Sequence, residues 1–377
     1  MPVKPEHSQG PEGYRLVVGG GGTGGHLFPG IAVAQAFKAR QPGNQVLFVN
    51  AGRPLEVDVL SRLGWSQRSI TIEGIKGRGR WQQFKAACKI PGAVWRAGCI
   101  LRRFRADLVL GVGGYSAGPV VTAATLMGIT SVLHEQNRLP GMTNRILGRL
   151  VDRIYLTFDE SREYFNPEKI RVSGNPVRDE ILAQASVPAA QAERVGDRDF
   201  TVLVVGGSQG AQAINLAVAD ALPYLKDVPA AHFVHQTGAP YVEEVREAYR
   251  RAGIDARVEA FFDDMAGLYA QADMIICRAG ATTVAEITVA GKAAVFVPFP
   301  FAADDHQTQN ALALADIGAA EMIRQEELNG AGLAKMIRGY MENRVLLTEM
   351  AAKARALGRP DAARVIVDDM YRLLEGR

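Results

Sequence analysis

A histidine follows a glycine-rich stretch near the start of the chain, RLVVGGGGTGGHLFPG, which spans residues 15–30. An apolar run that passes through glycines into a helix directs backbone N–H groups outward at the positive end of the helix dipole, where a phosphate is stabilised. His26 follows that turn, and an imidazole can accept a proton from a sugar hydroxyl near neutral pH. The pattern predicts either a general base beside a phosphate-bearing ligand or a histidine that caps its own helix.

The same stretch fits the dinucleotide-binding pattern G-x-G-x-x-G at Gly19, Gly21 and Gly24. That fingerprint also requires an acidic residue at the end of the second strand, where it binds the ribose hydroxyls. The second apolar run ends in Asn50 instead, and GGSQG at 206–210 lacks the glycine triplet. No Lys-Ser/Thr pair follows either loop, so a Walker phosphate loop is excluded and NAD is disfavoured.

Polar side chains cluster where other apolar runs end. His134, Glu135, Gln136 and Asn137 follow one such run. Burying four polar groups costs free energy unless they are paired or used, so they predict either a hydrogen-bonded turn or part of a site. Glu286, near the start of a predicted helix, is either a capping partner or an acceptor for ribose hydroxyls.

Two acidic motifs resemble metal sites but are not expected to bind one. Asp304, Asp305 and His306 are consecutive, and consecutive side chains rarely converge on one ion. Asp197 and Asp199 form a D-x-D motif, but they lie in a charged stretch that is expected to be a solvated linker. The sequence therefore predicts no metal.

The segment from Lys76 to Arg105 holds nine Lys and Arg residues, with aromatic residues among them and no acidic residue. A basic amphipathic helix with tryptophans suits the surface of an anionic bilayer, where each cation contributes about 1 kcal/mol. The alternative is an ordinary helix with its aromatics packed inward and its cations solvated. RNA binding is disfavoured because no nucleic-acid motif accompanies the segment. The residues expected to contact a membrane are Lys76, Arg78, Arg80, Trp81, Phe84, Lys85, Lys89, Trp95 and Arg96.

The composition is that of a globular protein, with 377 residues, 47% of them hydrophobic and 22% charged. A net charge of +3 argues against a nucleic-acid partner. Three cysteines without a C-x-x-C pair suit a reducing cytoplasm.

Residues 1–14 lack the apolar region of a signal peptide and are expected to be a disordered tail. The uncharged stretch 108–133 contains glycines and a proline, which favours a buried strand–helix–strand unit over a membrane span.

Short β-branched runs alternate with helical stretches along the whole chain, which predicts an α/β protein with a parallel sheet in each half. Both halves open with a strand, a glycine-rich turn and an alanine-rich helix. We therefore expect two Rossmann-like domains, over residues 15–176 and 177–360. A helix over 361–377 is expected to fold back onto the first domain.

Seven segments occur in order between residue 15 and about residue 311: GGTGGHLFPG, GVGGYSAGP, HEQNRLPGMTNR, SGNPVR, GGSQGA, CRAGATTVAE and PFAADDHQTQNA. Together they resemble the MurG family of bacterial peptidoglycan glycosyltransferases. The resemblance implies a GT-B fold, with two Rossmann-like domains facing each other across a cleft. It implies inverting transfer of N-acetylglucosamine from UDP-GlcNAc to the 4-hydroxyl of the muramoyl sugar of a lipid-linked pyrophosphoryl-muramoyl-peptide, without a cofactor or an obligatory metal. It also implies a peripheral location on the cytoplasmic face of the inner membrane, with other cell-wall synthesis proteins among the partners.

The resemblance implies a role for individual residues as well. His26 is the candidate base, and Glu135 is a second candidate. Family members often have an aliphatic residue where Phe262 stands, which a backbone contact tolerates. The expected donor contacts are Thr23, Gly24 and Gly25 in the first loop, Asn137 and Gln307 at the sugar, Arg178 and Ser208 at the diphosphate, the backbone of Phe262 at the uracil, and Ala281, Thr282, Thr283, Val284, Ala285 and Glu286 along the nucleoside, with Glu286 on the ribose.

Rival functions make different predictions. A non-hydrolysing UDP-sugar epimerase of the same architecture would turn over UDP-GlcNAc without an acceptor. A non-catalytic nucleotide-sugar sensor at the membrane would bind UDP-GlcNAc and release no UDP. An NAD-dependent dehydrogenase would show a nicotinamide-dependent absorbance change.

Overall fold

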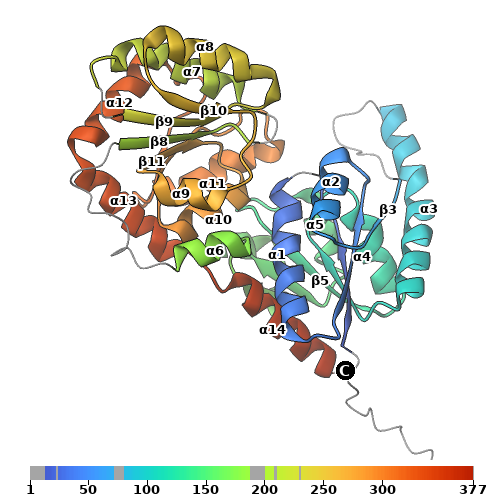
Figure 1. Ribbon diagram of the computed structural model, residues 1–377. Coiled ribbons are helices and arrows are strands. Elements are labelled where there is room, and N and C mark those ends of the chain that lie inside the picture. The colour runs from blue at the N-terminus through green and yellow to red at the C-terminus, as the bar shows by residue number, and fades with distance from the viewer. Residues whose placement is uncertain are drawn as a thin grey trace, which may run out of the picture.

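The computed structural model describes residues 13–22, 24–71, 80–186, 200–207, 210–228 and 231–376, and for residues 80–88 the backbone only. These residues form two lobes, each built on one parallel sheet (Figure 1). The predicted α/β class with two Rossmann-like sheets is confirmed. The expected tail, except for its last two residues, lies outside the described residues.

The N-terminal sheet has the strand order β3-β2-β1-β4-β5-β6-β7. Its central strands are buried along almost their whole length, as expected for a parallel sheet covered by helices on both faces. The strands are β1 (Arg15–Gly19), β2 (Gln45–Asn50), β3 (Gln67–Ser69), β4 (Leu108–Gly111), β5 (Thr130–Glu135), β6 (Arg153–Leu156) and β7 (Ile170–Val172). The helices are α1 (Gly24–Arg40), α2 (Pro54–Arg62), α3 (Arg80–Phe104), α4 (Ala117–Leu126) and α5 (Met142–Leu147), with short 3-10 turns at Asp159–Tyr164 and Pro167–Lys169.

The C-terminal sheet has the order β10-β9-β8-β11-β12-β13. Two apolar clusters, one on each face, form its core. The strands are β8 (Phe200–Val205), β9 (Ala231–Gln236), β10 (Ala256–Glu259), β11 (Met274–Cys277), β12 (Ala293–Phe296) and β13 (Glu321–Met322). The helices are α6 (Asp179–Ala185), α7 (Gln212–Ala221), α8 (Val242–Ala252), α9 (Met265–Gln271), α10 (Ala281–Ala290), α11 (His306–Ala315), α12 (Gly330–Glu342), α13 (Arg344–Leu357) and α14 (Ala362–Glu375), with 3-10 turns at Leu222–Leu225, Ala239–Tyr241 and Ala303–Asp305.

The uncharged stretch 108–133 forms β4, α4 and β5, as predicted. β4 pairs with β1 and β5, so its backbone groups are satisfied inside the sheet. Among the described residues, no helix is both long enough and apolar enough to cross a membrane.

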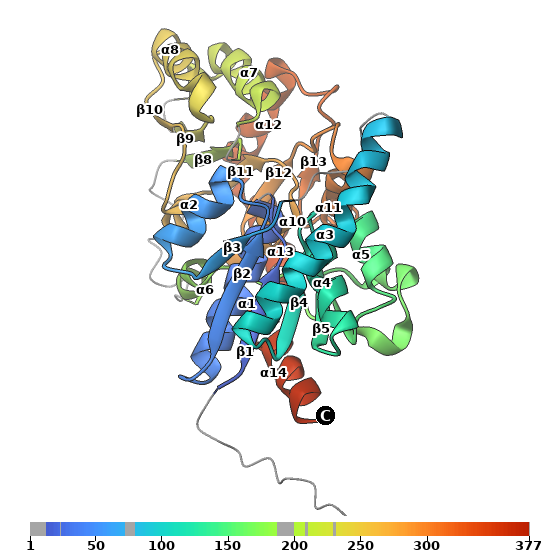
Figure 2. The same ribbon diagram turned by 90° about the vertical axis from the view of Figure 1, so that its right-hand side faces the viewer.

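The last helix, α14, leaves the C-terminal lobe and packs against α1 of the N-terminal lobe (Figures 1 and 2). Its buried Asp369 forms ion pairs with Arg153 at 3.0 Å and Arg171 at 2.7 Å, and accepts a hydrogen bond from Tyr155 at 3.1 Å. Tyr371 accepts a hydrogen bond from the Asn44 amide at 2.6 Å. The helix therefore ties the end of the chain to strands β6 and β7 and to the loop before β2.

The two lobes meet where α1 packs against α10. The Thr282 hydroxyl donates to the Gly25 carbonyl oxygen at 3.1 Å. The Asn310 side chain accepts from the Arg138 backbone N–H at 3.0 Å and donates to the Asn137 side chain at 3.2 Å. These contacts bring the starts of α1, α10 and α11 close to the end of β5.

Candidate active site

His26 lies in the first turn of α1, at the carboxyl end of the N-terminal sheet and beside the second lobe. Its side chain is only partly buried, and its Nδ1 lies 3.0 Å from Oε1 of Gln136. Burial lowers the pKa of His26, the Gln136 contact raises it by less, and charge on His306 lowers it further. The ring is therefore neutral near pH 7, which is the form that a general base requires.

Glu135 is buried at the end of β5, and its carboxylate is surrounded by donors. It accepts from the backbone N–H of Asn137 at 2.9 Å and of Gly141 at 3.1 Å. The side chains of Asn144 and Asn137 donate to it at 2.9 Å and 3.3 Å. Burial raises the pKa of Glu135, and these four contacts act in the opposite direction. The carboxylate thus holds the turn after β5, as the hydrogen-bonded-turn alternative predicted.

A carboxylate of α2 that was not among the residues expected from the sequence binds the glycine-rich loop. Glu56, which is fully buried, accepts from the backbone N–H groups of Gly22 and Arg53, and Arg53 donates back to the Gly22 carbonyl oxygen at 3.0 Å. On the other side of the loop, a Cβ added to Gly114 would clash with the carbonyl of Gly21. The glycines therefore allow two loops to pack backbone to backbone. A glutamate three residues after the Arg53 N-cap is the sequence signal that predicts the Glu56 contact.

Two expected donor-binding residues bind each other. The Arg178 guanidinium lies 2.9 Å from the Glu286 carboxylate, which also accepts from the Tyr269 hydroxyl at 3.1 Å. Arg178 stacks over the Phe28 ring of α1, 4.9 Å from its centroid. The arginine therefore contacts both lobes, and Tyr269 is a member of this cluster that the sequence did not indicate.

Comparisons with known proteins identify the family. Residues 16–156 match the glycosyltransferase family 28 N-terminal domain and residues 201–366 the C-terminal domain of that family. A protein from Syntrophus aciditrophicus named UDP-N-acetylglucosamine–N-acetylmuramyl-(pentapeptide) pyrophosphoryl-undecaprenol N-acetylglucosamine transferase is 48% identical, covering 96% of this chain and 99% of its own length. A relative of the same name from Geobacter metallireducens is 47% identical, covering 94% and 98%. The chain belongs to the MurG family.

Structural comparison agrees with this assignment. The crystal structure of MurG from Acinetobacter baumannii aligns with a TM-score of 0.76 at 36% identity, covering 95% of this chain and 99% of that one. The MnaA–UDP structure from S. aureus aligns with a TM-score of 0.68 at 12% identity, which shows a shared fold alone. The predicted GT-B arrangement of the MurG family is therefore confirmed.

The other residues that the MurG resemblance implies for the sugar and the uracil already have hydrogen-bond partners within the protein. Asn137 and Gln307 are both engaged, since Asn137 accepts from Asn310 and Gln307 accepts from the Phe299 backbone N–H at 3.0 Å. Phe262 is buried and its backbone N–H donates to Gln236 at 3.0 Å.

The start of α10 carries the other expected donor contacts. Thr283 is partly exposed, whereas Thr282 binds the other lobe. Gly24 and Gly25 open α1 opposite that segment. Thr23 and Ser208 lie outside the described residues, and the side chains of Ala281, Val284 and Ala285 are buried.

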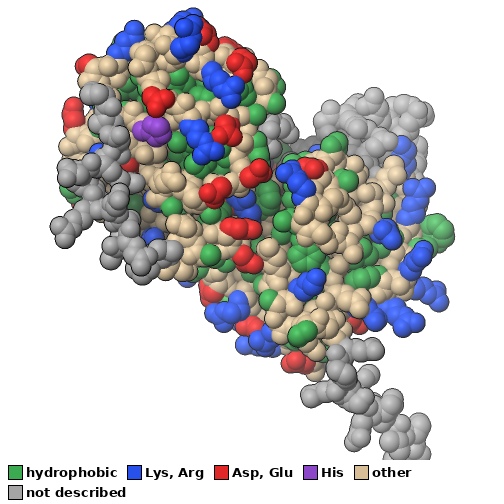
Figure 3. Space-filling model, viewed as in Figure 1, with side chains coloured by type: hydrophobic (Ala, Val, Ile, Leu, Met, Phe, Trp, Pro, Cys, Tyr) green, Lys and Arg blue, Asp and Glu red, His purple; other side chains and the backbone are tan. Residues whose placement is uncertain are grey.

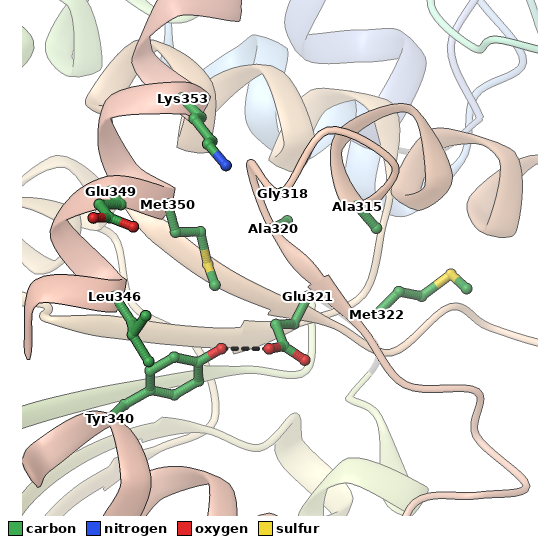
Figure 4. Close-up of a pocket in the computed structure, with 10 residues that line it drawn as sticks. All are labelled: Ala315, Gly318, Ala320, Glu321, Met322, Tyr340, Leu346, Glu349, Met350 and Lys353. Carbon is green, nitrogen blue, oxygen red and sulfur yellow. Dashed lines mark hydrogen bonds between the residues drawn. The ribbon is translucent and has the colours of Figure 1, made fainter. Parts of the chain in front are cut away.

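A separate hollow of about 400 Å³ lies on the C-terminal lobe between α12, α13 and β13 (Figure 4). Tyr340 donates to Glu321 at 2.5 Å across it, and Lys353 points toward it. No residue expected to take part in the transfer lines it.

Within the described ranges there is no group of three His, Cys, Asp or Glu that could hold a metal. In the motif of residues 304–306, Asp305 accepts from the Thr308 hydroxyl at 2.6 Å.

Proposed function

We propose that this chain transfers N-acetylglucosamine from UDP-GlcNAc to the 4-hydroxyl of the muramoyl sugar of undecaprenyl-pyrophosphoryl-MurNAc-pentapeptide, with inversion. The observation that carries the proposal is the near-full-length identity of 48% to a relative named for this reaction. A partly exposed, neutral His26 at the junction of the two lobes supports it.

The proposed chemistry is a single displacement at the anomeric carbon. The 4-hydroxyl oxygen forms a bond to that carbon, its proton passes to Nε2 of His26, and the bond from the carbon to the UDP oxygen breaks. Arg178 and backbone N–H groups near Ser208 would stabilise the departing diphosphate without a metal. Glu135 is not required as a base in this scheme, because its carboxylate is already committed to four donors.

We assign the donor to residues 177–360 and the acceptor to residues 15–176. Glu286 would accept hydrogen bonds from the ribose hydroxyls, beside the partly exposed Thr283. Asn137 and Gln307 would bind the sugar, and the Phe262 backbone the uracil. The start of α10 abuts Gly25, so a donor at α10 would present its sugar near His26.

We also propose that α3 rests on the anionic cytoplasmic face of the inner membrane. Over the described part of α3 the space-filling view shows several Lys and Arg side chains (Figure 3). Trp95 is 71% exposed and Leu126, on the adjacent α4, is 76% exposed. The acceptor's polyprenyl chain stays in the bilayer, so a basic, apolar face would bring the active site to it. The expected contacts from Lys76 to Arg78 lie outside the described residues, and for those from Arg80 to Lys85 the backbone alone is described.

Vesicle co-sedimentation tests the membrane proposal. We expect the chain to pellet with phosphatidylglycerol vesicles and not with phosphatidylcholine vesicles, and added salt to release it. Trp95→Ala combined with Arg96→Glu should weaken pelleting, whereas Arg251→Glu on the C-terminal lobe should not. Binding that ignores lipid charge and salt would contradict the proposal.

UDP release from UDP-GlcNAc, measured with and without the lipid-pyrophosphoryl-muramoyl-peptide acceptor, tests the reaction. We expect release that depends on acceptor. His26→Ala should lower kcat by about 10²–10⁴-fold and leave the KM for UDP-GlcNAc nearly unchanged. Turnover of UDP-GlcNAc without acceptor would favour an epimerase, and tight binding with no UDP release would favour a sensor.

A further inference from the structure

Gln136 links two histidines through its side-chain amide. Its Nε2 donates to the Val112 carbonyl oxygen at 2.9 Å and lies 3.1 Å from Nδ1 of His134. Its Oε1 lies 3.0 Å from Nδ1 of His26. The His134 carbonyl oxygen lies 3.3 Å from Nε2 of Gln136, so the two hydrogens of the amide nitrogen face acceptors only. The amide oxygen must therefore be the atom that faces His26.

His134 fixes the orientation of that amide. Its Nε2 lies 3.2 Å from the carbonyl oxygen of Gly174, which can only accept, so Nε2 carries the hydrogen. Burial lowers the pKa of His134 to about 4, so the ring is neutral and its Nδ1 is a bare acceptor. An inverted amide would place two acceptors, Oε1 of Gln136 and Nδ1 of His134, against each other.

The consequence for His26 concerns which nitrogen holds its proton. Oε1 of Gln136 is an acceptor, so Nδ1 of His26 must donate to it and the lone pair lies on Nε2. A ring without such a partner can carry the hydrogen on either nitrogen, and the form with a protonated Nε2 cannot take a proton there. The neutral amide orients the ring without adding the negative charge that would raise the pKa of His26.

We propose that Gln136 is a positioning residue that holds His26 in the Nδ1–H tautomer, and that the Val112 carbonyl and His134 together set the orientation of Gln136. The inference rests on the proposed role of His26 as the base. It gives Gln136 a role in the transfer that a turn residue would lack, because the tautomer of His26 decides whether Nε2 can accept the proton of the acceptor hydroxyl.

The test uses Gln136→Met, which keeps the length of the side chain and removes both polar atoms. We expect kcat to fall by about 10–100-fold, as for other residues that orient a reacting group, with the KM for UDP-GlcNAc unchanged. In ¹⁵N-histidine NMR spectra of the full chain at neutral pH, the His26 signals should move from the Nδ1–H form to a mixture of tautomers. Gln67→Met, the same substitution on β3, should change neither kcat nor these signals.

A second variant separates positioning from packing. Gln136→Glu replaces the amide with a carboxylate of the same shape, which should raise the pKa of His26 and move the acid limb of kcat/KM to higher pH. His306 and His134 are the other titratable groups acting around this site, and the carboxylate of the variant would face Nδ1 of His134 as well as His26. A folded Gln136→Met variant that keeps the Nδ1–H form, or that keeps the normal kcat, would overturn the inference. Normal turnover by His26→Ala would instead overturn the proposed base, whatever the tautomer in Gln136→Met.

Discussion

At the scale of single residues, the two candidate bases differ in their hydrogen-bond partners and in their exposure. Glu135 has four donors around a buried carboxylate, so a proton arriving there would displace a hydrogen bond that shapes the turn. His26 has Gln136 beside Nδ1, interacts with the backbone of Val112 and is partly exposed. Residue type alone did not distinguish them, because the difference lies in which neighbours the fold supplies.

The proposed role of His26 as the base predicts how the transfer depends on pH. A base acts in its unprotonated form, so activity falls as the pH drops through the pKa of the folded protein. Burial lowers that pKa from its ordinary value of 6.5, so we expect the acid limb of kcat/KM to have its midpoint below pH 6.5. Initial rates of UDP release between pH 4.5 and 8 measure it. An acid limb above pH 7, or the same limb in a residually active His26→Ala variant, would contradict this assignment.

The sequence indicated His26 and Glu286 as candidate site residues because each lies in the helix of a recognisable strand–turn–helix motif. It did not predict that Glu286 pairs with Arg178, since 108 residues separate them and only the packing of α6 against α10 brings them together. The sequence did not indicate the role that we propose for Gln136. That role depends on the direction of the side-chain amide, which is set by Val112, after β4, and through His134 by Gly174, after β7.

At the scale of elements, α14 is held by a buried charge. Asp369 is 2% exposed, and its carboxylate forms ion pairs with Arg153 and Arg171 and accepts a hydrogen bond from Tyr155. The helical pattern of its sequence predicts the helix. It does not reveal this anchor, because all three partners, on β6 and β7, are about 200 residues earlier in the chain.

Removal of the Asp369 carboxylate should destabilise the protein strongly. Asp369→Ala leaves two arginines and a buried hydroxyl without their shared acceptor, so we expect the free energy of unfolding to fall by about 3–5 kcal/mol. Asp368→Ala, one residue earlier and more exposed, should cost at most about 1 kcal/mol. Urea unfolding followed by circular dichroism compares the two, and equal losses would show that Asp369 is not the anchor.

At the scale of the whole molecule, each lobe contains a buried neutral histidine. His134 in the first has its pKa lowered to about 4, and His235 in the second has its pKa lowered to about 3, in both cases mainly by burial. The two-lobed fold itself was predictable, since strand and helix patterns alternate throughout. The contacts that join the lobes were not, because they depend on loop ends such as Gly25 and Asn310.

These histidines make stability fall with acidification. The unfolded chain takes up protons below pH 6.5 while the folded chain does not until about pH 4 or 3, so stability is present above pH 6.5 and is lost as the pH falls. Between pH 7 and pH 5 we expect each histidine to account for about 2 kcal/mol of lost unfolding free energy. Urea titrations at both pH values test this. His235→Gln should reduce the difference by about one histidine's share, and an unchanged difference would contradict the assignment.

The Arg178–Glu286 pair has a consequence for turnover. Arg178 and Glu286 already form an ion pair with each other. A nucleotide that binds either side chain would therefore replace contacts of that pair with its own. In the proposed donor site, departure of UDP would let the arginine and the nearly inaccessible carboxylate pair again, so neither charge would be left buried without a partner. Such an exchange would weaken nucleotide binding and ease product release to the same extent, because the pair would compete with the ligand for the same contacts.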